Sequence, residues 1–175
     1  MTRFVGSWLI LFVSCVVPSL VQAEPAIALN DHNPEVRRAA VTQLRRVPAT
    51  QAIPLLCLAM NDRDKTIVFA AYDALREHAL TAPNELLHEL NHPLESVRFG
   101  LLRVIVALPS QSIDALPLQT LLFDASPRIR LQAVQAIARH HQQQPVLRES
   151  IRRMILDPST EIKQAALDCL DRFDE

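Results

Sequence analysis

A segment repeated five times is the feature that most constrains the fold of this chain. The five copies share a polar turn, a branched aliphatic residue, usually a basic residue, and then small or apolar positions. The turns begin at Asp31, Asp62, His92, Asp124 and Asp157. The branched residues recur with a period of about 30 residues and are Val36, Ile67, Val97, Ile129 and Ile162. This period fits one helix–turn–helix unit per repeat, and such a unit buries its apolar face only by stacking on its neighbours.

The apolar residues within each segment have helical spacing. With the branched residue as position 0, positions 4, 8 and 11 complete an apolar stripe on one helix face. The first copy reads Val36, Ala40, Leu44, Val47, and the last reads Ile162, Ala166, Leu170, Phe173. An N-cap residue followed by Pro marks helix starts at 33–34 and 126–127. First helices are expected in the stretches 48–60, 81–90, 112–123 and 143–156, with only 26–30 in the first copy. These stretches predict about 4.5 repeats.

The glycine content agrees with an all-α fold. The chain is 49% hydrophobic and has two glycines. Strand-and-turn folds need glycine where a turn requires positive φ, so two glycines argue strongly against an all-β protein. One of them, Gly100, stands inside an apolar run. The net charge of −1 gives no bulk field that would favour nucleic acid or anionic lipid.

This pattern resembles the HEAT-repeat family, in particular its short bacterial form, the PBS-lyase-type repeat. The resemblance rests on the turn Asp, the pairs at 36–37, 97–98 and 129–130, and the Ala-rich second helix. It covers residues 30–173 and implies a right-handed α–α superhelix. It also implies an Asp–Arg ladder between neighbouring repeats. We expect that ladder to be incomplete in the middle, because Val68 replaces the Arg and His92 replaces the Asp.

The N-terminal segment, residues 1–23, has the pattern of a signal peptide. Arg3 supplies a short positive region, residues 4–17 form an apolar run, and Ala23 provides the small residue before a cleavage site. We therefore expect residues 1–23 to be removed and residues 24–175 to form one HEAT-like domain. The protein would be exported, and periplasmic if the source is a Gram-negative bacterium.

A lipoprotein is the alternative for the same segment. Residues 12–15 resemble a lipobox that ends at Cys15, although Phe12 fits that pattern poorly. Membrane attachment is expected only if Cys15 is lipidated.

The segment HELNH, residues 88–92, matches the H-E-x-x-H zinc signature. That signature requires both histidines on one face of a continuous helix. The repeat alignment instead places His92 in a turn, and Pro93 disfavours a helical conformation for the residue before it. We therefore expect a chance match, no metal and no catalytic residues. A metal-dependent hydrolase using His88, Glu89 and His92 is the alternative.

Other chemistries find less support in the residues. The family includes di-iron hydroxylases with several His-Glu dipeptides, whereas this chain has one such dipeptide, at His88. It also includes DNA glycosylases, which would need a basic concave surface with aromatic residues. The single Trp, Trp8, lies in the signal segment, so nucleic acid is not an expected partner. Cys57 and Cys169 are expected to be buried and too far apart to form a disulfide.

One outward position of the second helices suggests a binding surface. Position 2 lies about 200° from position 0 at 100° per residue, opposite the core stripe. The middle three copies have apolar residues there, whereas the end copies have Arg38 and Gln164. With neighbours at positions 5 and 9, the predicted partner-binding stripe comprises Phe69, Tyr72, Phe99, Leu102, Val106 and Leu131. Packing against neighbouring helices is the alternative for these side chains.

These observations predict a non-catalytic scaffold or adaptor without a cofactor. Its expected partner is another exported protein or a peptide, bound on the concave face of the solenoid.

Overall fold

The computed structural model of the chain describes residues 25–109, 116–140 and 145–173, and each regular element in these ranges is helical. A helical turn at residues 25–28 comes first. The elements that follow are α2 (Pro34–Leu44), α3 (Ala49–Ala59), α4 (Lys65–Thr81), α5 (Pro83–His88), the 3₁₀ helix η1 (Glu89–Asn91), α6 (Glu95–Ala107), α7 (Leu116–Leu121), α8 (Pro127–His140), α9 (Pro145–Met154) and α10 (Thr160–Phe173).

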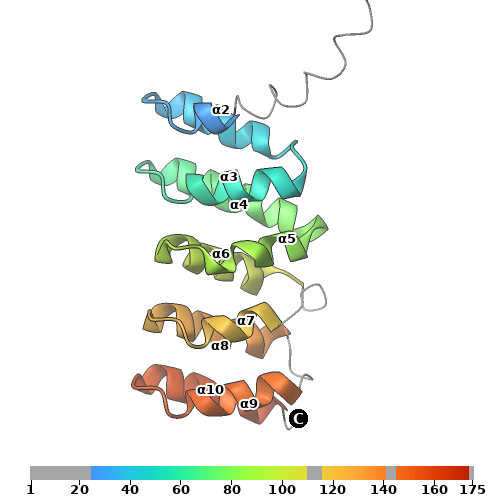
Figure 1. Cartoon of the computed structure of the whole chain (residues 1–175), viewed down its shortest axis with the longest axis vertical. Helices are drawn as coiled ribbons and strands as arrows, with labels where there is room; N and C mark the ends of the chain where they lie inside the picture. The colour runs from blue at the N-terminus through green and yellow to red at the C-terminus, as the bar shows by residue number, and fades with distance from the viewer. Residues whose placement is uncertain (1–24, 110–115, 141–144, 174–175) are drawn as a thin grey trace, which may run out of the picture.

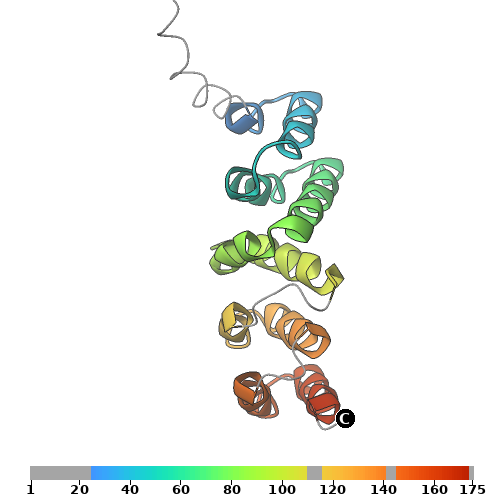
Figure 2. The ribbon, with the colours of Figure 1, turned by 90° about the vertical axis from the view of Figure 1, so that its right-hand side faces the viewer.

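Pairs of helices stack one above another along the length of the molecule (Figure 1). The first helices of the repeats form one column and the second helices form the other (Figure 2). The second helices α2, α4, α6, α8 and α10 pack against one another in that order. The chain is an all-α solenoid, which confirms the fold predicted from the repeat.

The apolar stripe forms the core, with two departures among the side chains that the structure describes. Ile67, Val97 and Ile129 at position 0 are fully buried, whereas Val36 in the first copy is 37% exposed. Val36 has less cover than its counterparts, because only one helical turn, at residues 25–28, precedes α2 in the described chain. The second departure is at position 11 of the second copy, where a histidine, His78, is buried. Its Nε2 atom lies 2.9 Å from the carbonyl oxygen of Leu44. This contact satisfies a carbonyl at the end of α2.

Side-chain caps set where α2 and α4 begin. Asn33 accepts a hydrogen bond from the Glu35 amide at 3.0 Å, and Pro34 opens α2 as predicted. Asp64 plays the same part for α4 by accepting from the Thr66 amide at 2.8 Å. These caps satisfy amide groups that have no partner within the helix.

An arginine ladder joins the repeats at three interfaces. In the first rung, Arg37 donates from Nε and Nη2 to both carboxylate oxygens of Asp62, at 2.7 and 3.0 Å. The same Arg37 side chain donates to the Asp31 carbonyl of its own turn at 2.8 Å. Equivalent bidentate pairs join Arg98 to Asp124 and Arg130 to Asp157. Each arginine therefore ties its own turn to the turn of the next repeat.

The ladder is interrupted between the second and third repeats, as the sequence predicts. Val68 and His92 hold the two positions of that rung, and they cannot form an ion pair with each other. His92 keeps one function of the missing Asp, because its Nδ1 accepts a hydrogen bond from the Leu94 amide at 3.2 Å. Asp157 does the same for the Ser159 amide at 2.8 Å.

The two cysteines of the described chain are buried and unpaired, as expected. Cys57 on α3 and Cys169 on α10 are 0% and 1% exposed. Burial raises the pKa of Cys57 to about 12 and the pKa of Cys169 to about 11. Both thiols therefore stay protonated at neutral pH, and a thiolate is the reactive form.

Neither Cys57 nor Cys169 should react with a thiol reagent such as DTNB while the protein is folded. Adding urea should release both thiols in the same transition that abolishes the helical circular dichroism. Rapid labelling of either thiol at pH 7 in native buffer would contradict this, because it would require local opening of α3 or α10.

Within the described ranges, no helix combines the length and apolarity needed to cross a membrane. The predicted signal segment, with Cys15, lies outside the described residues.

Candidate partner-binding surface

The second helices expose one continuous face, because they lie side by side in one column (Figure 2). Counting from the branched residue at 100° per residue, the outward positions are −1, 2, 6, 9 and 10. These positions lie on the side of the helix that points away from the core stripe. We call the side chains at these positions the second-helix face.

Position 2 of each second helix lies beside position −1 of the next one. At the first interface, Arg38 donates to the Thr66 hydroxyl at 2.7 Å. At the third interface, the guanidinium of Arg128 lies over the ring of Phe99, 3.5 Å from its centroid. The residue at position −1 therefore decides how much of the preceding position 2 reaches solvent.

Phe69 has the most exposed ring among the predicted residues, with 65% of its surface accessible. By the repeat equivalence, the residue beside it at position −1 is Ser96, which is too short to cover a phenyl ring. Phe99 is half buried instead, and it packs against the core as well as under Arg128. Phe69 is thus an uncovered aromatic side chain, whereas Phe99 at the same repeat position is covered by Arg128.

The other predicted residues divide by position. Tyr72 is half buried, with the Arg103 guanidinium 5.3 Å from its ring centroid. Leu131 and Val106 are also half buried and pack against the core. Leu131 and Val106 join Phe69 and Phe99 on the second-helix face but expose only part of their surface, whereas Tyr72, at position 5, lies at its border.

The expectation that Leu102 flanks the exposed stripe is wrong. Leu102 is fully buried, and so are Val41 and Val134 at the same position 5 of their repeats. Position 5 lies about 140° from position 0, on the side that the next second helix covers. A residue there belongs to the interface between repeats, whatever its distance from the helix's own core stripe.

A shallow groove continues the second-helix face toward the ends of α6, α8 and α10, and the sequence analysis did not find it. Its volume is about 570 Å³. It is lined by Val106, Val134, Gln135, Ala138, Arg139, Ala165, Asp168, Cys169 and Arg172. The small residues Ala138 and Ala165 are the sequence signal for it, since they leave space between neighbouring helices.

The HELNH segment does not form one helical surface. Helix α5 ends at His88, η1 covers Glu89 to Asn91, and His92 has an extended conformation with ψ 137°. The placement of His92 in the turn is confirmed. Its Nδ1 already accepts the Leu94 amide. Among the described residues, no three or more His, Cys, Asp or Glu side chains lie together in an arrangement that could hold a metal ion.

Known structures share this fold at low sequence identity. The TOG domain structure of crescerin, which uses a TOG domain array to regulate microtubules in the primary cilium, matches with a TM-score of 0.63 and 19% identity, over 90% of this chain and 76% of that chain. A designed armadillo repeat protein in complex with the peptide (KR)4 matches with a TM-score of 0.54 and 18% identity, over 89% of this chain and 84% of that chain. At these identities the likeness shows the fold alone.

The sequence comparison points the same way. Residues 24–98 match the family model described as HEAT repeats. No curated protein sequence matches the chain. The matched residues, together with the repeat period, the Arg–Asp ladder and the solenoid of the described chain, confirm the resemblance to HEAT repeats.

Proposed function

We propose that this protein is an exported, non-catalytic scaffold that binds another exported protein or a peptide through its second-helix face. Repeat solenoids of this kind are typical of protein-interaction scaffolds, and one structural neighbour is a designed repeat protein in complex with a peptide. The signal pattern of residues 1–23 supports export. Lipidation at Cys15 would attach the same scaffold to a membrane.

The exposed ring of Phe69 is the observation that carries this proposal. A large aromatic side chain that is 65% exposed loses the free energy that burial would provide. Aromatic residues on such surfaces are frequent anchors of protein interfaces and often contribute about 2 kcal/mol or more each. Tyr72, Phe99 and Leu131 extend the apolar surface around it, although each is half buried.

The arginines on this face support recognition more than reaction chemistry. Arg103 over Tyr72 and Arg128 over Phe99 are cation–π contacts, which hold both partners in place at an exposed site. A surface with restrained side chains loses less conformational entropy when a partner binds. The proposal assigns no reaction to HELNH, because the α-helix ends between its two histidines.

A photo-crosslinking amino acid placed at position 69 should form a discrete adduct in cells, recovered from the exported fraction. The matched control carries the same amino acid at position 58. Leu58 is 57% exposed but lies on α3, in the column of first helices (Figure 2). Position 58 should give little or no adduct, because it is on a first helix and not on the second-helix face.

The comparison of the two positions decides the proposal. Equal adducts at 69 and 58, or adducts only at 58, would rule out the second-helix face as the docking surface. The absence of any adduct at 69 in the exported fraction would also count against it.

A further inference from the structure

We propose that the segment bound by this face is acidic and extended, with apolar side chains between its carboxylates, and that it binds across α6 and α8. This inference rests on the proposed function and adds the chemistry of the partner. It is carried by the charge of the second-helix face, the groove beside it, and the stacking of two arginines on aromatic rings.

The outward positions of α6 and α8 carry positive charge. Their charged side chains are Arg103 on α6, with Arg128 and Arg139 on α8, and all three are exposed. The remaining outward positions of these two helices have uncharged residues. Glu95, at the start of α6, accepts a hydrogen bond from the Ser126 hydroxyl at 2.8 Å and stands at the turn end of this patch.

The neighbouring second helices differ in charge. On α4, Arg76 is accompanied by Asp73 and Glu77. Glu77 forms an ion pair with Arg45, the residue that follows α2. On α10, the outward positions hold the acidic residues Glu161, Asp168 and Asp171 and the basic residue Arg172. The positive patch of α6 and α8 therefore lies between two helices that carry both acidic and basic residues.

The geometry of the arginines suits carboxylate ligands. A guanidinium that lies flat on a ring keeps its N–H groups directed outward along its edge, where they can bind a carboxylate through two hydrogen bonds. The guanidinium carbon of Arg128 lies over the Phe99 ring, 3.5 Å from its centroid. Arg103 is held more loosely, at 5.3 Å from the Tyr72 centroid. Both stacks restrain the arginine before a ligand arrives.

The groove supplies the apolar contacts that an acidic segment needs for affinity. Val106, Val134 and Ala138 line it, together with the charged side chains of Arg139, Arg172 and Asp168. A leucine or similar residue of the partner could enter the groove while the flanking carboxylates reach Arg103 and Arg139. Both kinds of contact are needed, because exposed ion pairs alone contribute little.

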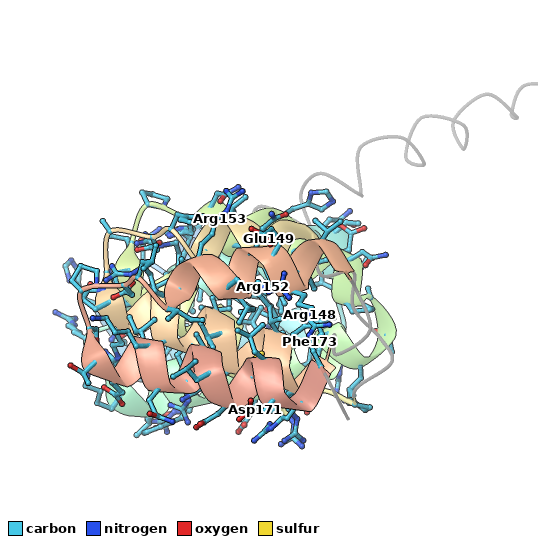
Figure 3. All side chains as sticks on the ribbon, turned by 90° about the horizontal axis from the view of Figure 1, so that it is seen from below. Arg148, Glu149, Arg152, Arg153, Asp171 and Phe173 are labelled. Carbon is cyan, nitrogen blue, oxygen red and sulfur yellow. The ribbon has the colours of Figure 1, made fainter. Side chains whose placement is uncertain are left out.

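A polynucleotide fits the same surface less well. Its longer phosphate backbone would continue across α10, where the exposed Asp171 would repel it. Figure 3 shows Asp171 on α10 at the end of the solenoid, with Arg152 and Arg153 on the separate helix α9. The short basic patch and its acidic border favour a peptide segment of limited length.

Fluorescence anisotropy of the full protein with three labelled probes tests this inference. The probes are the peptide (Glu-Glu-Leu)4, the peptide (Lys-Lys-Leu)4 and a single-stranded oligonucleotide of 12 bases. We expect the acidic peptide to bind most tightly, with an affinity that falls as salt increases. Stronger binding of the lysine peptide or of the oligonucleotide would overturn the inference, and so would the absence of acidic-peptide binding.

A charge-matched pair of variants locates the site. Arg103→Glu with Arg139→Glu should weaken acidic-peptide binding by at least tenfold. Arg152→Glu with Arg153→Glu changes the net charge equally on α9, and it should alter binding by less than twofold. Equal losses in both variants would show a general charge effect and overturn the site. Circular dichroism melts confirm that each variant is folded, and Arg103→Gln with Arg139→Gln should give an intermediate loss.

The two experiments fail in different ways. A crosslink at position 69 without acidic-peptide binding would leave the docking face in place and remove only the proposed partner chemistry. Acidic-peptide binding without a crosslink at position 69 in cells would remove the proposed function, and the peptide binding would then have no role in docking.

Discussion

Replacing Ile137 with Ala is expected to lower the free energy of unfolding by about 2–5 kcal/mol. Ile137 is fully buried on α8, at position 8 of the core stripe. Removing its side chain loses apolar burial and leaves a cavity that the surrounding helices fill only in part. Because each repeat is stabilised through its neighbours, the loss should also loosen the packing of α8 on α6 and α10. Urea unfolding followed by circular dichroism measures the change.

Phe69→Ser is the matched surface variant for this measurement. Its ring is 65% exposed, so the substitution should change the free energy of unfolding by less than about 1 kcal/mol. If the Phe69 variant loses as much stability as the Ile137 variant, the ring is a packing residue and the second-helix face loses its anchor. A small loss of stability would be consistent with a Phe69 side chain that contacts a partner and not the core.

Asp157→Ala should lower the free energy of unfolding by about 1.5–3 kcal/mol, because it removes the last rung of the ladder. Asp157 accepts hydrogen bonds from Arg130 at 2.7 and 3.1 Å and from the Ser159 amide at 2.8 Å. The substitution leaves the Arg130 guanidinium with 14% of its side chain exposed and without its carboxylate partner. Asp168→Ala is the control, because Asp168 is exposed and contacts Gln164 within its own helix. It should change stability by about 0.5 kcal/mol or less.

The aspartates of the ladder should make the free energy of unfolding depend on pH in the acid range. The hydrogen bond from Arg130 lowers the pKa of Asp157, and the hydrogen bond from Arg37 lowers the pKa of Asp62. A carboxyl with a lowered pKa in the folded state binds fewer protons there than in the unfolded state. Its stabilisation is therefore complete above the ordinary Asp pKa of about 3.9 and is lost as the pH falls through the lower folded value.

Urea midpoints measured between pH 7 and pH 2.5 test this sign. The wild-type midpoint should stay nearly level near neutral pH and fall below about pH 4. Asp157→Asn should start from a lower midpoint and fall less steeply in the acid range. Parallel curves for the two proteins would mean that Asp157 does not contribute to the acid transition.

The repeat pattern was sufficient to predict the main features of the fold. The spacing of the branched residues fixes the helix pairs, since a stripe of this period can be buried only by stacking. The interrupted rung follows from two residues, Val68 and His92. They replace the arginine and the aspartate, so they cannot form the pair that Arg37 forms with Asp62. The turn position of His92 likewise follows from its place in the repeat and from Pro93.

The candidate site required the tertiary structure, because the exposure of a side chain depends on residues of the next repeat. Phe69 and Phe99 occupy the same repeat position, yet Arg128 covers only Phe99. Leu102 is buried for a related reason, since the next second helix lies against position 5. Helical periodicity describes the angle of a side chain around its own helix and contains no information about the neighbouring helix.

Close packing between repeats was also decided by the assembled solenoid. Gly100 is an ordinary member of an apolar run in the sequence. In the structure, a Cβ at Gly100 would lie 1.9 Å from the terminal methyl of Met60, which follows α3 of the preceding repeat. The sequence by itself determined which residues are helical and which rungs can form. Only the tertiary structure decided which side chains the next repeat covers, because that depends on the size of residues brought together by stacking.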